Sequence, residues 1–112
     1  MPDGVEPTVG DGVHIEANYD GTEAIITVEG ELDLSGTASF WTHVSEALAA
    51  QPGSIAIQAG GLTFIDSSGL MALARARDAA DGAGVAFRIL EQSPAFRRIA
   101  ELAGVEDLLG GD

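Results

Sequence analysis

The stretch Asp66-Ser67-Ser68-Gly69 contains the side chains of this sequence that are best suited to chemistry. It follows a strand-like apolar run and a connecting segment at 62–65, and it leads into a helix-like run at 70–75. The first N–H groups of a helix have no partner within the helix, and the helix dipole favours negative charge there, including phosphate. A serine at this position can therefore cap the helix, act as a nucleophile or accept a phosphate group.

Capping explains much of this stretch, because the side chains of Asp and Ser readily accept hydrogen bonds from the free N–H groups of a helix start. Two features favour a further role. Gly69 is a poor helix former, which indicates that something approaches the backbone closely. In addition, a cap needs only one of the hydroxyls of Ser67 and Ser68. The role of a hydrolase nucleophile is disfavoured, because no motif places a histidine base near Ser67.

The motifs of several other kinds of site are missing from the sequence. It has no G-x-S-x-G elbow, no phosphate-binding P-loop and no H-E-x-x-H pair. Cysteine is absent, which excludes disulfides and thiolate ligands. His14 falls on the polar side of an early strand and His43 on the outward side of a helix, neither with neighbours at metal-ligand spacing. We therefore expect two solvated histidines, no metal site, no cofactor and no catalytic residue.

Acidic residues dominate the composition of this 112-residue chain, whose net charge is −13. Residues 1–74 contain 11 acids and no lysine or arginine, whereas residues 75–112 contain 7 acids and 5 arginines. Such a surface repels nucleic acid and anionic membranes and suits a partner with a basic patch, although solubility alone also explains it. No signal-peptide pattern and no apolar run of about 18 residues is present, so we expect a soluble cytoplasmic protein without membrane insertion.

The hydrophobic pattern divides the chain into an arm and one domain. Residues 1–12 combine proline, glycine and acids without periodicity, which predicts a flexible N-terminal arm, and residues 13–112 form a single domain. Alternation predicts an antiparallel hairpin over 13–29, and apolar runs predict strands at 55–59 and 85–90. Helices are predicted at about 36–51, 68–81 and 94–103, with Ser35 as the first N-cap.

This order of elements predicts the α/β fold class. After the hairpin, strands and helices alternate, which is typical of parallel strands joined by right-handed crossovers. We therefore expect a mixed β-sheet, made of an N-terminal antiparallel hairpin plus parallel strands. In a chain of this length the helices are expected to pack mainly on one face, leaving the other face partly exposed.

Three blocks of the sequence, in the right order, resemble the STAS domain family and in particular the bacterial anti-sigma factor antagonists. The segment 64–70 resembles the phosphorylation loop of these domains, and Gly30-Glu31-Leu32-Asp33 resembles their G-E-L-D element. The third block is Ser93-Pro94-Ala95 with Phe96 and Gly104-Val105. The resemblance spans residues 13–109 and implies a STAS-type fold.

The resemblance also implies which residues form the site. Ser67 takes the place of the phosphorylated serine, with Ser68 as the rival position. Asp33 and Asp66 match the acidic positions beside that serine, and Gly69 belongs to the same partner-binding loop. Although Asp33 and Ser67 are 34 positions apart, the family match implies that they lie close together at one end of the sheet.

The function implied by the resemblance is a phosphorylation switch in the regulation of transcription during a stress response. The unphosphorylated form binds an anti-sigma factor serine kinase, which then releases its sigma factor, and phosphorylation of Ser67 switches this binding off. A serine phosphatase resets the switch. The kinase carries the ATP and Mg²⁺, and this chain acts as a monomer or weak dimer. The alternative is an accessory subunit of a lipid-import ABC transporter, which works without phosphorylation.

Overall fold

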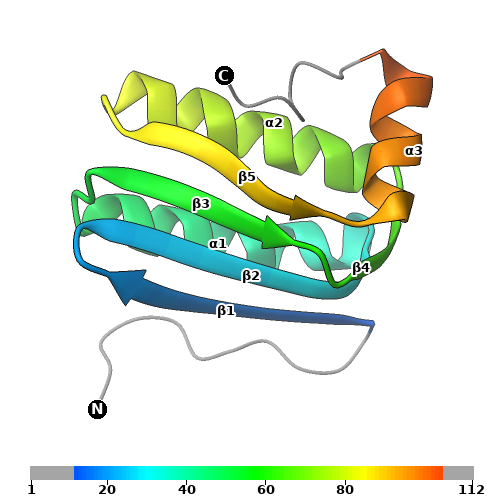
Figure 1. The fold of residues 1–112 in the computed structure, drawn as a ribbon, viewed down its shortest axis with the longest axis horizontal. Coiled ribbons are helices and arrows are strands. Elements are labelled where there is room, and N and C mark those ends of the chain that lie inside the picture. The colour runs from blue at the N-terminus through cyan, green and yellow to red at the C-terminus, as the bar shows by residue number, and fades with distance from the viewer. Residues whose placement is uncertain (1–11, 105–112) are drawn as a thin grey trace.

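The computed structural model describes residues 12–104, which form one mixed sheet with three helices (Figure 1). The elements in chain order are β1 (Val13–Asp20), β2 (Glu23–Leu32), α1 (Leu34–Ala49), β3 (Ser54–Ala59), β4 (Leu62–Ile65), α2 (Ser67–Gly82), β5 (Ala86–Gln92) and α3 (Pro94–Ala103). The arm expected at 1–12 falls outside the described residues except for Gly12, and so does the end of the chain from residue 105.

The sheet has the predicted mixture of directions. Its strand order is β1-β2-β3-β5, with β4 paired to β2 beyond the end of β3. Strands β1 and β2 form an antiparallel hairpin, whereas β3 and β4 run parallel to β2, and β5 runs parallel to β3. The predicted fold class, a hairpin followed by parallel strands, is therefore confirmed.

Strand β4 was not expected from the sequence, which predicted a loop at these positions. The ten-residue strand β2 makes it possible, because its first half pairs with β3 and its last three residues pair with β4. The register shifts between Gly30 and Glu31. Gly30 has a φ of 90°, and a Cβ on it would lie 2.1 Å from the carbonyl oxygen of Gly12. Gly30 thus forms a bulge within β2, rather than ending the strand as expected.

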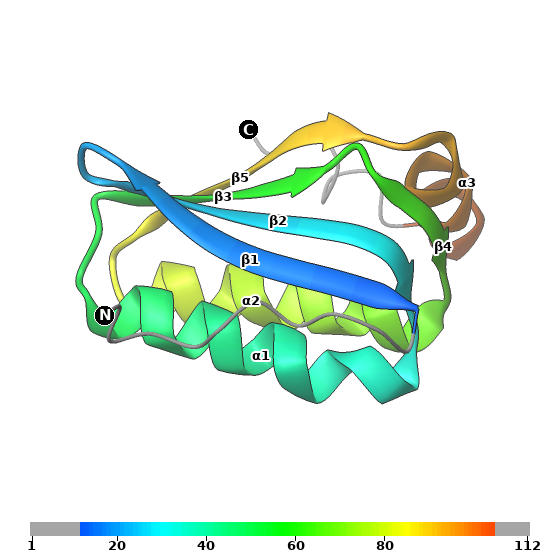
Figure 2. The same cartoon turned by 90° about the horizontal axis from the view of Figure 1, so that it is seen from below.

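Helices α1 and α2 lie side by side on one face of the sheet, and α3 packs beside β4 at the end of the sheet (Figure 2). The opposite face has no helix among the described residues. The core lies between the sheet and the helices and includes Ile15, Ile26, Ile57, Phe40 and Leu73, all fully buried. None of the described helices is long and apolar enough to cross a membrane.

The expected outward position of His43 is wrong. Its side chain is 1% exposed, and its Nδ1 lies 2.8 Å from the carbonyl oxygen of Ser39 in the preceding turn. The buried stripe of α1 is wider than its apolar residues indicate, because His43 lies between Phe40 and Ala47 on the same side of the helix. A hydropathy pattern counts histidine as polar and therefore places this side chain in solvent.

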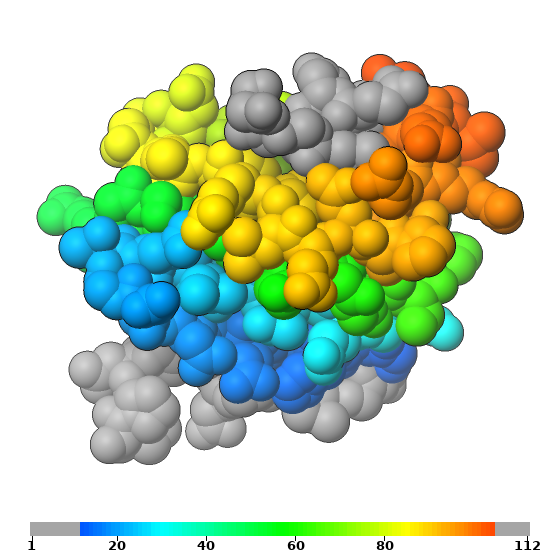
Figure 3. Space-filling model, in the orientation of Figure 1, coloured from blue at the N-terminus to red at the C-terminus, as the bar shows by residue number. Residues whose placement is uncertain are grey.

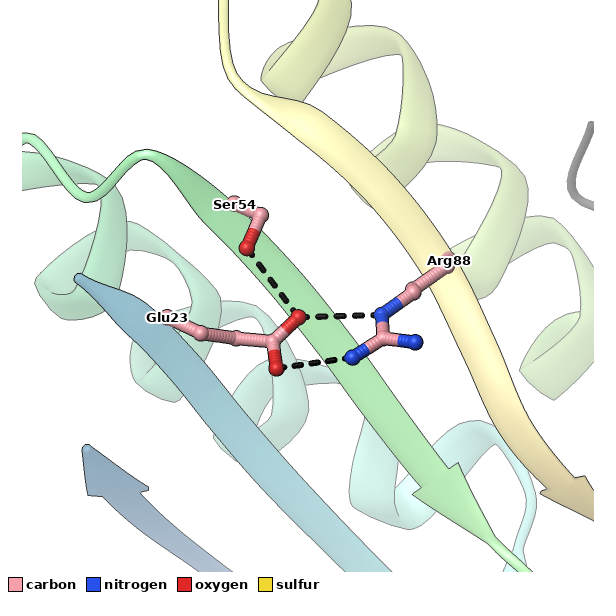
Figure 4. A network of polar contacts seen from close by, with 3 residues as sticks. All are labelled: Glu23, Ser54 and Arg88. Carbon is pink, nitrogen blue, oxygen red and sulfur yellow. Dashed lines mark hydrogen bonds and ion pairs between the residues drawn. The ribbon is translucent and has the colours of Figure 1, made fainter. Parts of the chain in front are cut away.

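The helices leave one face of the sheet open (Figure 3), and a polar network on this sheet joins Glu23, Ser54 and Arg88 (Figure 4). Arg88 of β5 reaches across β3 and donates two hydrogen bonds to Glu23 of β2, at 3.0 and 2.8 Å, and the Ser54 hydroxyl donates a third at 3.0 Å. Ala56 pairs in register with Arg88 and is fully buried. A small side chain at the centre of β3 therefore lets the two long side chains meet across it.

Replacing Glu23 should lower stability in a pH-dependent way. The hydrogen bonds from Arg88 hold the pKa of Glu23 below its usual value. The stabilisation is therefore present above the ordinary carboxyl pKa of about 4.3 and is lost as the pH falls through the lower folded-state value. We expect Glu23→Gln to lower the melting midpoint by about 2–4 °C at pH 7. Thermal unfolding followed by circular dichroism should show this difference narrowing below about pH 4.

The matched control is Glu29→Gln, on the same strand. Glu29 is exposed and has no ion pair among the described residues. Its substitution should leave the melting midpoint nearly unchanged at both pH values. An equal loss for the two variants, or a loss for Glu23→Gln that persists in acid, would contradict the role given to the network.

Candidate functional site

All three helices begin at the same end of the sheet, where the parallel strands finish. Strand β2 leads directly into α1, β4 into α2 and β5 into α3, and the N-caps of these helices are Asp33, Asp66 and Ser93. Leu32 pairs with Ile65 in the parallel register of β2 and β4. Asp33 and Asp66 therefore follow neighbouring residues of the sheet, and Ser67 begins α2 at the same end of the domain as Asp33.

The carboxylate of Asp66 performs the capping of α2. Its Oδ1 accepts a hydrogen bond from the Gly69 N–H at 3.0 Å, and its backbone carbonyl accepts from the Leu70 N–H at 3.0 Å. Ser67 is exposed and Ser68 half-buried. Among the described residues, neither hydroxyl has a hydrogen-bond partner. Of the roles considered from the sequence, capping thus falls to the aspartate, and both hydroxyls stay available for other contacts.

Asp33 caps α1 in the same way, and this corrects the expectation that Ser35 is the N-cap. Asp33 Oδ1 accepts hydrogen bonds from the Ser35 hydroxyl at 2.6 Å and from the Ser35 N–H at 3.0 Å. The strand β2 extends to Leu32, so the helix begins earlier than predicted. The hydrogen bond from the Ser35 hydroxyl lowers the pKa of Asp33 below its usual value, which keeps a negative charge next to the start of α2.

The two helix starts share a pattern that went unnoticed in the sequence. The segments 32–36 and 65–69 both read apolar-Asp-x-Ser-Gly, and each aspartate is an N-cap. By this pattern Leu34, which is 72% exposed, occupies on α1 the position that Ser67 occupies on α2. An exposed apolar side chain therefore accompanies the exposed hydroxyl at this end of the domain.

The ends of strands β2 and β4 approach the backbone of Gly69 closely. A Cβ on Gly69 would lie 2.3 Å from the carbonyl oxygen of Leu32 and 2.8 Å from Cγ1 of Ile65. Cβ atoms essentially never come that close to other atoms. The missing side chain thus allows the first turn of α2 to press against the ends of β2 and β4, which fixes Ser67 relative to Asp33.

No histidine lies beside Ser67 to serve as a base. His14 Nε2 is 3.0 Å from Oε1 of Glu16 on β1, and the side chain of His43 on α1 is buried. Within residues 12–104, no three His, Cys, Asp or Glu side chains are grouped so that they can hold a metal ion. The described residues thus leave the Ser67 hydroxyl exposed next to the Asp66 cap, at the end of the sheet where Asp33 also lies.

Comparison with known proteins identifies the family. The family model described as "Mlab, STAS domain" matches residues 15–110. The chain belongs to the STAS domain family. No curated protein matches it in sequence.

Solved structures show the same fold. An anti-sigma factor antagonist from Mycobacterium paratuberculosis superposes with a TM-score of 0.78 at 20% identity, covering 91% of this chain and 86% of that one. The anti-sigma factor antagonist SpoIIAA in its unphosphorylated form gives a TM-score of 0.72 at 20% identity, covering 85% and 84%. The Bacillus cell fate determinant SpoIIAA in its phosphorylated form gives 0.67 at 20% identity, covering 85% and 87%.

A side chain at position 69 should destabilise the domain. Gly69→Ala forces the first turn of α2 away from Leu32, and we expect the free energy of unfolding to fall by at least about 2 kcal/mol. Gly82→Ala is the matched control, because Gly82 ends the same helix and a Cβ there would meet nothing within 4 Å. That change should leave stability unchanged or raise it by up to about 1 kcal/mol. Urea unfolding measures both values, and equal stabilities would rule out the close contact.

Proposed function

We propose that this STAS domain is a cytoplasmic anti-sigma factor antagonist controlled by phosphorylation of Ser67. The observation that carries the proposal is the exposed Ser67 hydroxyl, which begins α2 and makes no hydrogen bond within the described residues. It directly follows the capping aspartate Asp66, at the end of the sheet where Asp33 caps α1. The fold shared with anti-sigma factor antagonists supports the same role.

Phosphorylation at this position changes the surface without disturbing the fold. Because Asp66 caps α2, a phosphate on Ser67 displaces no capping hydrogen bond, and the helix dipole favours its negative charge. The phosphate adds about −1.5 to −2 charges next to Asp33 and Asp66. Repulsion and the cost of desolvating this charge oppose binding of a partner that fits the unmodified surface. A loss of about 3 kcal/mol corresponds to a roughly hundredfold weaker affinity.

The partner in this proposal is an anti-sigma factor with serine-kinase activity. It binds the surface formed by Asp33, Asp66, Ser67, Ser68 and Gly69, releases its sigma factor, and supplies the ATP and Mg²⁺ that phosphorylate Ser67. A serine phosphatase restores the binding form. The antagonist contributes no cofactor and acts as a monomer or weak dimer.

Substitution of Ser67 should separate binding from phosphorylation. Ser67→Ala should bind the anti-sigma kinase with nearly unchanged affinity, because the lost hydroxyl has no partner within the domain, and it should incorporate no phosphate. Ser67→Asp should bind more weakly, although it carries less charge than phosphate. Purified candidate kinases, radiolabelled ATP and isothermal titration calorimetry measure both properties.

Ser68→Ala is the control for the choice of serine, and it should still be phosphorylated. Phosphate incorporation into Ser67→Ala would move the acceptor to Ser68 or another hydroxyl. If no anti-sigma kinase binds or modifies the unmodified protein, and a transporter ATPase binds it instead, the phosphorylation switch is wrong and the accessory-subunit alternative replaces it.

A further inference from the structure

A groove runs between α1 and α2 and extends from the site described above, with which it shares Ser68. Its volume is about 670 Å³, in the range of binding sites for small ligands. We call it the α1–α2 groove. Its lining residues are Leu34, Thr37, Ala38, Trp41, Thr42, Ser68, Met71, Ala72 and Arg75. The side chains that bury these helices against the sheet are different ones, including Phe40 and Leu73.

The groove exposes large apolar side chains to solvent. Leu34 is 72% exposed and Met71 is 71% exposed, and Trp41 is only half-buried. Apolar side chains that gather around a groove, in a chain with a net charge of −13, mark a surface that is covered in a complex. Since Ser68 lines the groove and Ser67 precedes it, this surface is continuous with the proposed switch.

Arg75 gives the groove a specific charge. Its guanidinium carbon lies 4.0 Å from the ring centroid of Trp41, so the indole holds the cation in place. None of the carboxylates among the described residues forms an ion pair with Arg75, although acids greatly outnumber bases in the chain. A guanidinium held in this way has its N–H donors free to bind a carboxylate with two parallel hydrogen bonds.

We propose that the α1–α2 groove receives an aliphatic side chain of the anti-sigma factor, and that a carboxylate next to it in that partner binds Arg75. This inference rests on the proposed function and names the contacts by which the partner is held. Arg75 is seven residues from Ser68, or about 10 Å along α2. Because Ser67 directly precedes Ser68, a phosphate on Ser67 lies near one end of the groove, where it repels the partner's carboxylate.

The test measures the affinity of purified anti-sigma kinases for variants of the full chain by isothermal titration calorimetry. Met71→Glu should raise the Kd at least about tenfold, because it places a charge in the apolar part of the groove. Leu102→Glu is the matched control, since Leu102 is 77% exposed and lies on α3 outside the groove. That change should alter the Kd by less than about twofold. Circular dichroism verifies that both variants fold.

Charge variants test the role of Arg75. Arg75→Glu should weaken binding more than Met71→Glu does, and Arg75→Lys should recover part of the affinity by keeping the charge. The salt dependence of the Kd should become smaller in Arg75→Ala than in the unmodified protein. An Arg75→Glu variant that binds as well as the unmodified protein would contradict the proposed contact between Arg75 and a carboxylate of the partner.

Trp41 lines the groove and is the single tryptophan of the chain, so a signal from tryptophan reports on the groove alone. Replacement of this residue by 5-fluorotryptophan gives one ¹⁹F resonance, which should shift when the unlabelled kinase is added. If the kinase binds without shifting this resonance, and Met71→Glu binds with unchanged affinity, docking of the partner in the groove is refuted. The proposed function then remains intact. Absence of binding by the unmodified protein refutes both.

Discussion

The contact between the first turn of α2 and the end of β2 is the constraint on which the site depends. Leu32 pairs with Ile65, and the missing side chain of Gly69 lets the helix backbone come against the Leu32 carbonyl. Leu32 directly precedes Asp33, and Ile65 directly precedes Asp66. This contact therefore also sets the spacing between Asp33 and Ser67. The position of the exposed hydroxyl is therefore determined by backbone packing in the core, and does not require an ordered side-chain network at the surface.

At this end of the domain, the residues that stabilise the helix starts differ from the residue proposed to be modified. The carboxylates of Asp33 and Asp66 satisfy the N–H groups at the starts of α1 and α2, and the Ser35 hydroxyl donates to Asp33. These aspartates have partners and contribute to the fold, whereas Ser67 has none among the described residues. The proposed modification of Ser67 is therefore expected to change the charge of the surface at little cost to stability, whereas modification of a serine that capped the helix would remove a capping hydrogen bond.

Clear hydrophobic patterns predicted most of the fold, because the hairpin alternates, the helices bury one side, and β3 is an apolar run buried at the consecutive residues Ile55, Ala56 and Ile57. The four-residue strand β4 shows no such period, and it depends on the bulge at Gly30, which a hydropathy pattern reads as the end of β2. His43 was misplaced because a polar side chain occupies a buried stripe. The positions of Asp33 and Ser67 came from family resemblance. The α1–α2 groove was missed because it combines side chains from two helices. Leu34 and Met71 are 37 positions apart, and only the packing of α1 against α2 brings them together.

The distribution of charge connects the groove to the switch. The first 74 residues contain no basic residue, and Arg75 is the first one in the chain. It lies on the helix that begins with Ser67, and its guanidinium is held over the ring of Trp41 on α1. A partner that docks against this end of the domain thus meets two carboxylates, apolar side chains and the guanidinium of Arg75, which forms no ion pair within residues 12–104. In the proposed switch, phosphate on Ser67 adds negative charge at the start of α2, which increases the repulsion of acidic groups of the partner and offsets their attraction to Arg75. Under this proposal one modification weakens two kinds of contact at once, so a single serine is sufficient for the switch.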